Sequence, residues 1–426
     1  MTTIKAFNGF IYNQEKVEDI SKVVCPPYDV ISPKRQDYFH ELSPYNFIRL
    51  ILGKDIAGED KYERSAKLLE DWISKHILIN EKKEALYFYR QVYKVRGESK
   101  SRDGLIGLLK IEDKDSCVFG HEHTRLEPKE DRLKLINATA ANLSPIFALF
   151  PDRKRIISLI SQKYLRNLPL LFELTDDELV KHALWRIDEP ELLAKITQDM
   201  KGENFFIADG HHRYEVACIY REQIRKKYNG LTGNEDCNFL MSYFTNTEPR
   251  NLSVFPIHRL LKLNDPIDLD ALLAKLKNYF DVEEVRDKEK FFFLLEKAGN
   301  AEHVLGMSTQ KRLWLLRLKN IKLLDKFMSD KPPVYRKLDV AILNSLVFDR
   351  IMDISTADKE HLIYSHDAEE VLKEVDTHQH YLAFLLNPVK VKQIMEVATA
   401  GEKMPPKSTY FYPKVLSGLV INKHRG

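Results

Sequence analysis

The chain has 426 residues, of which 44% are hydrophobic and 30% are charged, as is usual for a globular protein. Its 66 Lys and Arg residues against 63 Asp and Glu residues leave a net charge of +3, which argues against binding nucleic acid through a broadly basic surface. Four scattered cysteines without a CxxC pair argue against a disulfide framework and against a thiolate zinc site. Any anion that the protein binds must therefore be held locally.

The N-terminal stretch, MTTIKAFNGFIYNQEK, carries charge early and lacks the apolar core of a signal peptide. No apolar run approaches the roughly 20 residues needed to span a bilayer. We therefore expect a cytoplasmic protein with no membrane partner. The sequence does not fix the oligomeric state.

Hydrophobic spacing in the first third of the chain predicts short strands alternating with helices. Residues 62–77, YERSAKLLEDWISKHI, have apolar residues at helical spacing. Residues 85–95, ALYFYRQVYKV, are rich in aromatic and β-branched residues and predict a strand. A neighbouring strand is expected at residues 104–113, with SKSRDG, residues 99–104, as the turn.

Charged residues dominate the stretch 153–199, which we expect to be helical. After residue 263, amphipathic helices alternate with strands such as KRLWLLRL, residues 311–318. We therefore expect an α/β fold with mixed sheets. A boundary near Asn264 would divide a core, residues 1–263, from a C-terminal α/β subdomain, residues 264–426.

The stretch FFIADGHHR places five polar or flexible residues directly after an apolar strand, residues 204–208. The glycine lacks a Cβ, so the backbone can turn sharply and approach a ligand there. The helix that follows offers first-turn amide groups and the positive end of its dipole, which favour an anion. Arginine and histidine add donors. The predicted phosphate-binding residues are Asp209, Gly210, His211, His212 and Arg213.

A plain helix cap is the alternative explanation of this corner. Asp209 would then cap the helix, and Arg213 would pair with Glu215 or Asp209 at the surface. We favour a functional site because two adjacent histidines and an arginine within half a helical turn seldom serve packing.

A second polar cluster lies in VFGHEHTRLEPKEDRL. In an extended segment, His121 and His123 would project to one face and Glu122 to the other. The two histidines are expected to contact phosphate or substrate, and Lys129 and Arg132 on the following helix are expected to point toward the same cavity. A solvated strand end and a metal site are the alternatives, and two histidines without a fixed third ligand are a weak metal signal.

The segment CPPYDVIS is stiffened by two prolines, which suits a loop that holds a carboxylate in place. Asp29 is the candidate general base, and Tyr28 is a candidate for stacking on a base or for a hydroxyl contact. Sulfiredoxin-like chemistry would require Cys25 to lie beside the predicted phosphate-binding residues 209–213, called here the phosphate corner. Nothing near Cys25 in the sequence lowers the pKa of its thiol.

Near the C-terminus, MPPKSTYFYPK is rich in aromatic residues and stiffened by proline. We expect residues 404–414 to fold back across the first half of the chain. Lys407, Ser408, Thr409 and Lys414 would then supply donors to a phosphate. In PIHRLL, His258 and Arg259 end a predicted strand and are expected to line the same crevice.

These motifs carry a resemblance to known families. IADGHHRYEVA resembles the signature of the ParB/sulfiredoxin-like fold, in which a strand–glycine–basic–helix corner binds nucleotide phosphates. Over this corner alone, the chain is similar to the archaeal ADP-dependent free-serine kinases. Over nearly its whole length it resembles a bacterial and archaeal family of unknown function, often labelled ParB-like. The supporting stretches, in chain order, are CPPYDVIS, GHEHT with PKEDRL, ANLSPIFALF, FPIHRL, KLDVAIL and MPPKSTYFYPK.

The resemblance implies a nucleotide-dependent phosphotransferase that uses ATP or ADP with Mg²⁺ and acts on a small metabolite such as serine or phosphoserine. Gly210 and the helix N-terminus would hold phosphates, Arg213 and His211 would stabilise transition-state charge, and Asp29 or Glu122 would take the hydroxyl proton.

Two other functions stay open. One is a nucleotide-sensing ParB-like binding protein without catalysis, against which the chain shows no basic recognition helix. The other is a metal-dependent hydrolase that uses His121, His123 and His211.

Overall fold

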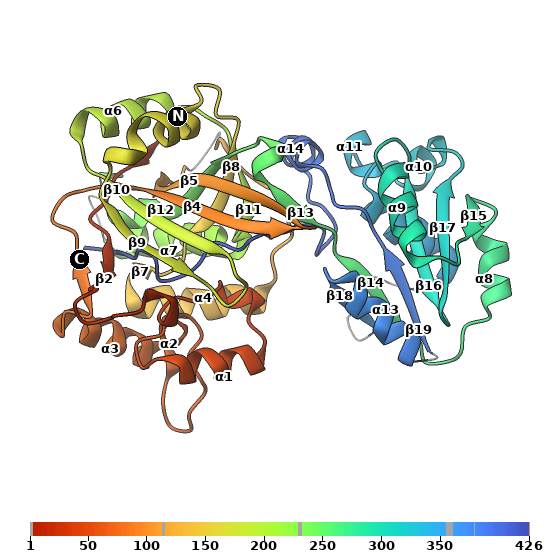
Figure 1. The fold of residues 1–426 in the computed structure, drawn as a ribbon, viewed down its shortest axis with the longest axis horizontal. Coiled ribbons are helices and arrows are strands. Elements are labelled where there is room, and N and C mark those ends of the chain that lie inside the picture. The colour runs from red at the N-terminus through yellow and green to blue at the C-terminus, as the bar shows by residue number, and fades with distance from the viewer. Residues whose placement is uncertain (1–2, 113–115, 229–231, 355–360, 379, 426) are drawn as a thin grey trace. The chain divides into compact units, whose positions relative to one another are not determined.

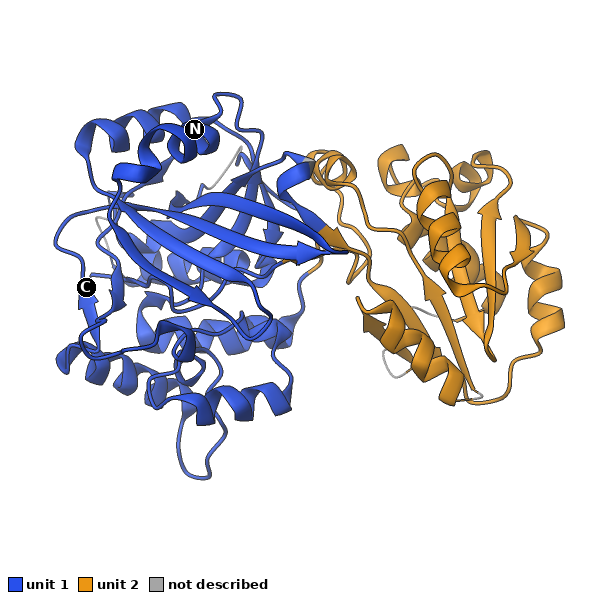
Figure 2. Ribbon diagram, viewed as in Figure 1, with its two compact units in different colours: residues 1–120, 124–253, 413–426 blue, residues 121–123, 254–412 orange. Residues whose placement is uncertain are grey.

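The structure is a computed structural model that describes residues 3–112, 116–228, 232–354, 361–378 and 380–425. The chain divides into two compact units, shown in Figure 2. The first comprises residues 1–120, 124–253 and 413–426, and the second comprises residues 121–123 and 254–412. Each unit is built on its own sheet with helices packed on it, which confirms a mixed α/β fold.

A nine-stranded mixed sheet forms the centre of the first unit among the residues described (Figure 1). Its strands are β1 (Ile4–Lys5), β4 (Leu86–Val95), β5 (Glu98–Lys110), β6 (Val118–Gly120), β8 (Ile146–Phe150), β9 (Leu170–Thr175), β10 (Lys181–Ile187), β11 (Phe205–Asp209) and β12 (Phe239–Asn246). They lie in the order β6, β11, β8, β12, β5, β4, β10, β9, and β1 pairs with β5. Smaller pairings join β2 (Phe10–Tyr12) to β3 (Leu78–Asn80) and β7 (Ala141–Asn142) to β21 (Asn422–Lys423).

The central hairpin of this sheet, β4 and β5, was expected, but its turn lies earlier than the sequence suggested. The chain reverses at Arg96 and Gly97, which have φ angles of 51° and 82°. Such positive φ angles suit the two-residue turn of a hairpin. Residues 99–104, expected to form the turn, instead pair along β4. Of the expected strand 104–113, β5 covers the part up to Lys110, and Asp113 lies outside the described residues.

Helices cover both sides of this sheet (Figure 1). They are α1 (Pro33–Leu42), α2 (Ile48–Ile51), α3 (Lys61–Ser74), α4 (Leu126–Thr139), α5 (Ile156–Leu159), α6 (Pro190–Asp199) and α7 (His211–Lys227). Ile156 of α5 and Leu192 and Ile196 of α6 join a core with the strands. Ile136 of α4 packs with Val216 of α7 in a second cluster. No helix in the described ranges is long and apolar enough to cross a membrane.

The expectation of a wholly helical stretch at residues 153–199 is wrong in part. Helices α5 and α6 lie within it, but β9 and β10 form an antiparallel hairpin between them. β9 is the edge strand of the sheet, and its residues alternate between buried and exposed positions. The charges of this part of the chain include three in the turn between the two strands, at Asp176, Asp177 and Glu178, and they give it the composition of a surface helix.

The second unit contains a six-stranded sheet among its described residues, in the order β15, β17, β16, β19, β14, β18. Its strands are β14 (His258–Lys262), β15 (Phe280–Glu284), β16 (Val304–Thr309), β17 (Arg312–Leu318), β18 (Leu362–Ser365) and β19 (Tyr381–Leu385), with β13 (Ser253–Phe255) and β20 (Tyr410–Tyr412) paired separately. Its helices are α8 (Leu269–Leu276), α9 (Lys288–Ala298), α10 (Lys322–Phe327), α11 (Pro333–Arg336), α12 (Asp339–Ile342), α13 (Ala368–Thr377) and α14 (Val391–Thr399). A π-helical segment, Leu343–Met352, follows α12.

One edge of the first unit's sheet positions the candidate site. β6 and β11 are parallel neighbours, with Gly120 opposite Ile207. Their carboxyl ends therefore meet at the same edge, where ligands commonly bind in α/β proteins. Asp209 ends β11 at this edge, and α7 begins two residues later.

Candidate functional site

The turn from β11 into α7 depends on Gly210. This residue has a φ angle of 92°, in the left-handed region that glycine adopts without strain. A Cβ atom built on it would lie 3.0 Å from Cζ of Arg213 and 3.0 Å from Cγ2 of Ile146. The guanidinium group therefore lies over the glycine, in space that a side chain would occupy. As the N-cap residue, Gly210 offers no side-chain acceptor to the first-turn amides of α7.

A buried ion cluster lies at the centre of this corner. The Asp209 carboxylate accepts from Arg213 Nη2 at 2.7 Å and from Lys414 Nζ at 2.6 Å. The three side chains are only 10–15% exposed. Burial acts to raise the pKa of Asp209, but Lys414 and Arg213 outweigh it and hold that pKa well below its ordinary value. Two cations thus share one carboxylate, which leaves an excess positive charge at the positive end of the α7 dipole.

Arg213 is oriented by both of its terminal nitrogens. Nη1 donates to the carbonyl of Pro145, while Nη2 holds Asp209. Its Nε is buried and has no hydrogen-bond acceptor among the described residues. A buried guanidinium donor without an acceptor is costly, so this N–H is suited to meet the oxygen of a ligand.

The two histidines have different surroundings. His211 is 5% exposed, and its charge contributes to the low pKa of Asp209. The Nε2 atom of His212 accepts from the backbone N–H of Arg125 at 3.0 Å, so this nitrogen carries a lone pair rather than a proton. His212 therefore fastens the start of α4 to α7. Glu215 does the same by accepting from Thr124 Oγ1 at 2.5 Å.

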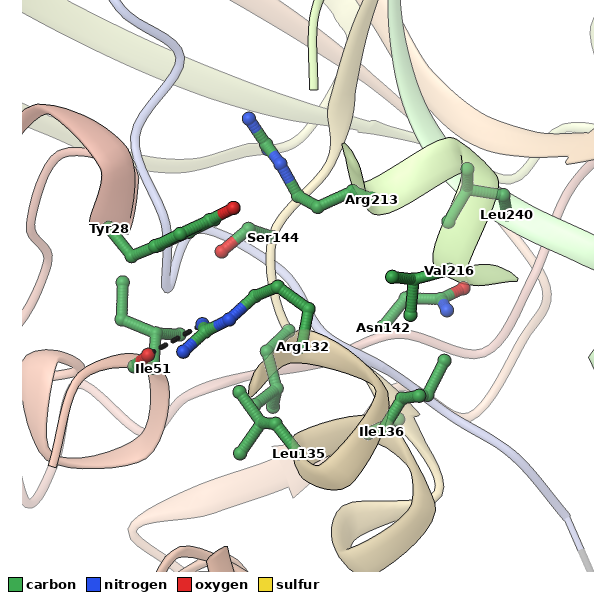
Figure 3. A pocket seen from close by; sticks show the side chains of 12 residues that line it. Tyr28, Ile51, Arg132, Leu135, Ile136, Asn142, Ser144, Arg213, Val216 and Leu240 are labelled. Carbon is green, nitrogen blue, oxygen red and sulfur yellow. Dashed lines mark hydrogen bonds between the residues drawn. The ribbon is translucent and has the colours of Figure 1, made fainter. Parts of the chain in front are cut away.

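A cavity of about 60 Å³ lies beside the corner, between α4, α7 and the turn at Tyr28 (Figure 3). Seven aliphatic residues and five polar ones line it. They are Ile51, Leu135, Ile136, Ala141, Leu143, Val216 and Leu240, and Tyr28, Arg132, Asn142, Ser144 and Arg213. Arg213 therefore belongs to both the ion cluster and the cavity.

Tyr28 is held at the cavity by Arg132, whose Cζ lies 4.1 Å from the centre of the tyrosine ring. Arg132 itself is fixed by Asp131 and by the carbonyl of Ile51, to which Nη1 donates at 2.6 Å. Burial is the main cause that raises the pKa of Tyr28 to about 12, and the charge of Asp29 is the second. The Tyr28 hydroxyl therefore stays protonated. Asp29 follows Tyr28 in the same 3-10 turn and is exposed.

Cys25 has no sign of reactivity. It is 1% exposed, and its backbone pairs with Ser417. Burial raises the pKa of its thiol far above the ordinary value, which suppresses the nucleophilic thiolate. The structure therefore gives no support for sulfiredoxin-like cysteine chemistry.

Eight of the residues singled out from the sequence belong to the second unit, and six of them lie in its segments 121–123 and 407–409. His121 is buried, and its Nε2 lies 3.2 Å from Oγ1 of Thr409. The hydroxyl of Ser408 donates to the carbonyl of Pro405. Glu122 forms a parallel bridge with Met404. His123 and Lys407 are exposed, so the two histidines of this segment differ in burial. The structure thus groups His121 with Thr409 within this unit.

His258 and Arg259 were expected to end a strand near the corner after β11. They do not lie in the sheet that contains β11. Both lie on β14, in the interior of the second unit's sheet. His258 Nδ1 accepts from the backbone N–H of Leu386 at 3.1 Å, and burial lowers the pKa of His258 to about 4. Burial and these contacts show that both residues belong to the core of the second unit.

Sequence reasoning missed parts of this site. Nothing local to Lys414 reveals Asp209 as its partner, because 205 residues separate them. Ser144, within ANLSPIFALF, was not predicted as a site residue, although it lines the cavity. The available signal was the pair of polar residues Asn142 and Ser144 shortly before the buried strand β8. Among the described residues, no group of three or more His, Cys, Asp and Glu could hold a metal ion.

Substitution of Gly210 by alanine tests whether the glycine makes room for Arg213. We expect a loss of about 1–2 kcal/mol in unfolding free energy from the left-handed backbone, and a further loss because Cβ displaces the guanidinium group. The matched control is Gly97→Ala, which has a φ angle of 82° but open space around the added atom. Urea denaturation measures both. Equal losses in the two variants would contradict the role assigned to Gly210.

The fold is that of a mixed α/β protein with an ion cluster at the start of a helix and a small cavity beside it. Residues 4–341 match the family described as "Protein of unknown function (DUF1015)". This match covers most of the chain, and the chain therefore belongs to that family. A comparison with curated proteins gives no match.

Solved structures show a weak likeness. A free serine kinase in complex with AMP is 14% identical with a TM-score of 0.33, covering 69% of this chain and 83% of that one. SbnI with C-terminal truncation from Staphylococcus aureus is 11% identical with a TM-score of 0.38, covering 73% and 85%. A conserved hypothetical protein from Pyrococcus furiosus is 13% identical with a TM-score of 0.32, covering 70% and 88%. These scores are too low to carry a residue or an activity over to this chain.

Proposed function

We propose that the chain is a nucleotide-dependent phosphotransferase with a ParB/sulfiredoxin-like corner that binds the phosphates of ATP or ADP. One observation carries the proposal. At the start of α7, two buried cations converge on the single carboxylate of Asp209, beside a glycine N-cap that offers no side-chain acceptor. An anion is the ligand that balances such a site.

The ion cluster explains how phosphate binding is prepared before the ligand arrives. Asp209 keeps Arg213 and Lys414 ordered and charged in a buried place, where a lone cation would be costly. A phosphate at the first turn of α7 would meet the helix dipole, the free Nε of Arg213 and His211. Donors that are already fixed need no rearrangement as negative charge develops on a transferring phosphoryl group.

Asp29 is the carboxylate that best fits the remaining roles. Both oxygens of Asp209 already accept from Lys414 and Arg213, whereas Asp29 is exposed and follows Tyr28, which lines the cavity. An oxygen ligand of this kind, together with phosphate oxygens, is what Mg²⁺ usually takes. We propose Asp29 as the base that takes the hydroxyl proton, or as the Mg²⁺ ligand. Mg²⁺ would neutralise phosphate charge.

We propose further catalytic or binding residues in the second unit from the sequence alone. Glu122 is the second candidate for the base. His121, His123, Lys407, Ser408 and Thr409 are candidate contacts to phosphate or substrate. Alanine variants of each, assayed for turnover and for nucleotide binding, separate a part in the reaction from a part in the packing of the unit.

A phosphotransfer assay tests the proposal. The full chain is incubated with ATP or ADP, Mg²⁺ and a panel of hydroxy amino acids and hydroxy acids that includes serine, and phosphorylated product is detected by ³¹P nuclear magnetic resonance. We expect product with at least one acceptor and at least a hundredfold lower turnover in Asp29→Asn at unchanged nucleotide affinity. Saturable nucleotide binding without transfer to any acceptor would instead favour the nucleotide-sensing binding protein.

A further inference from the structure

We propose that the cavity beside the phosphate corner receives the aliphatic arm of the acceptor, and that the acceptor is a short-chain aliphatic hydroxy acid. This inference rests on the proposed phosphotransferase function and names the substrate class of the same site. The acceptor would place two to four carbons among the aliphatic side chains and keep its oxygen atoms at the polar side of the cavity.

The aliphatic side chains that line one side of the cavity, called here its floor, favour an apolar group of the ligand. Leu135, Ile136, Ala141, Val216 and Leu240 line the floor and are each less than 9% exposed. A polar group placed against them would lose water without gaining a partner. A methylene group placed there gains roughly fourfold in affinity, the equivalent of its transfer from water. Serine, which has no aliphatic arm beyond its hydroxymethyl group, would leave this floor uncovered.

The size of the cavity sets the length of the arm. Its volume is about 60 Å³. An engineered apolar cavity of about 150 Å³ holds a benzene molecule. The cavity beside the corner has less than half that volume, so we expect it to favour a short or branched aliphatic chain over a phenyl ring or a purine base. The nucleobase of the phosphate donor must then lie elsewhere.

The polar side of the cavity suits the carboxylate and hydroxyl oxygens of the acceptor. Figure 3 shows the hydroxyl end of Tyr28 directed toward Ser144 and Arg213, with the aliphatic side chains on the other side of the open space. The Nε of Arg213, which has no acceptor among the residues described, is left for the phosphate. A hydroxy acid would place its oxygen atoms at the hydroxyls of Tyr28 and Ser144 while its arm covers the floor.

Arg213 links this cavity to the phosphate corner. It lines the cavity and lies over Gly210, and Val216, one turn further along α7, lines the cavity as well. An acceptor hydroxyl near Arg213 would face a phosphate at the start of α7. In the transfer, the hydroxyl oxygen bonds to the terminal phosphorus of ATP, the bond from that phosphorus to the bridging oxygen breaks to leave ADP, and the hydroxyl proton goes to Asp29.

The test is a chain-length series. Binding of 3-hydroxypropionate, 3-hydroxybutyrate and 3-hydroxyisovalerate, which differ by one methyl group each, and of serine, threonine and mandelate to the full chain with saturating ADP and Mg²⁺ is measured by calorimetry. We expect affinity to rise about fourfold for each added methyl group up to the branched acid, and the aromatic acid not to bind. Leu135→Ala should move the optimum to a longer chain, and Ala141→Leu should weaken the branched acid at least tenfold.

The outcomes separate this inference from the function on which it rests. Affinity that does not change with chain length, or an Ala141→Leu variant that binds the branched acid as the wild type does, overturns the inference. Phosphate transfer to any acceptor of the panel leaves the function standing in that case. A graded series without phosphate transfer overturns the function instead. In both variants, an unchanged thermal shift with ADP shows that the fold is intact.

Discussion

Replacement of Arg213 by alanine is expected to weaken the binding of ATP and ADP by roughly ten- to a hundredfold. A charge-assisted hydrogen bond contributes about 1.5–3 kcal/mol, and this variant removes the buried Nε donor that we assign to phosphate. Lys414 still neutralises Asp209 in the variant, so the corner keeps its structure. Calorimetric titration of both nucleotides with Mg²⁺ measures the loss.

The matched control is Arg225→Ala, in the last turn of the same helix. Arg225 Nη1 contacts Glu222 at 3.3 Å, near the opposite end of α7 from the proposed phosphate. This variant removes an arginine from α7 without touching the first turn, so nucleotide affinity should be unchanged. Wild-type affinity in Arg213→Ala, or an equal loss in both variants, would contradict the assignment.

Replacement of Lys414 by methionine is expected to lower the free energy of unfolding by about 1.5–3 kcal/mol, because Asp209 loses one charge-assisted hydrogen bond and keeps only the one from Arg213. Lys414 is 11% exposed and Asp209 15%, so water cannot take over the role of the ammonium group. Methionine keeps most of the volume of the lysine stem, which limits the packing loss. Urea denaturation at pH 7 measures the change.

Two further variants isolate the charge. Lys423→Met removes the ion pair to Glu70, which is 60% exposed, and should change stability by less than about 1 kcal/mol. In Lys414→Met with Asp209→Asn, the buried carboxylate is gone, and part of the stability should return. A loss in Lys414→Met no larger than that in Lys423→Met would show that the cluster does not hold the corner together.

The same cluster gives stability a defined dependence on pH. The folded pKa of Asp209 lies below its unfolded value of about 3.9, so its contribution is fully present above that value. The contribution is lost as the pH falls further and the carboxyl group protonates in the unfolded chain and then in the folded one. Asp209→Asn should therefore flatten the acid side of the stability curve.

Local patterns were enough to predict the elements around the corner. The apolar run before Asp209 and the helical spacing after it predicted β11 and α7, and aromatic and β-branched residues predicted β4. These elements are fixed by side chains near one another in sequence. The β9–β10 hairpin was missed because the charged turn between its strands, residues 176–178, gives the stretch the composition of a surface helix.

The contacts that define the site are long-range, and periodicity carries no information about them. Lys414 reaches Asp209, and Arg213 donates to the carbonyl of Pro145. The sequence suggested that Gly210 brings the backbone close to a ligand. The structure adds that the missing Cβ makes room for the guanidinium group of Arg213, three residues further along the chain. This second role depends on how the Arg213 side chain folds back over the glycine.

The central claim is that the start of α7 binds the phosphates of a nucleotide. Calorimetric titration of the wild-type chain with ADP and with adenosine, at two salt concentrations, tests it most directly. The account predicts saturable ADP binding that weakens as salt rises, and at least hundredfold weaker binding of adenosine, which lacks the phosphates. Equal affinity for ADP and adenosine, or no binding of ADP at millimolar concentration, would contradict it.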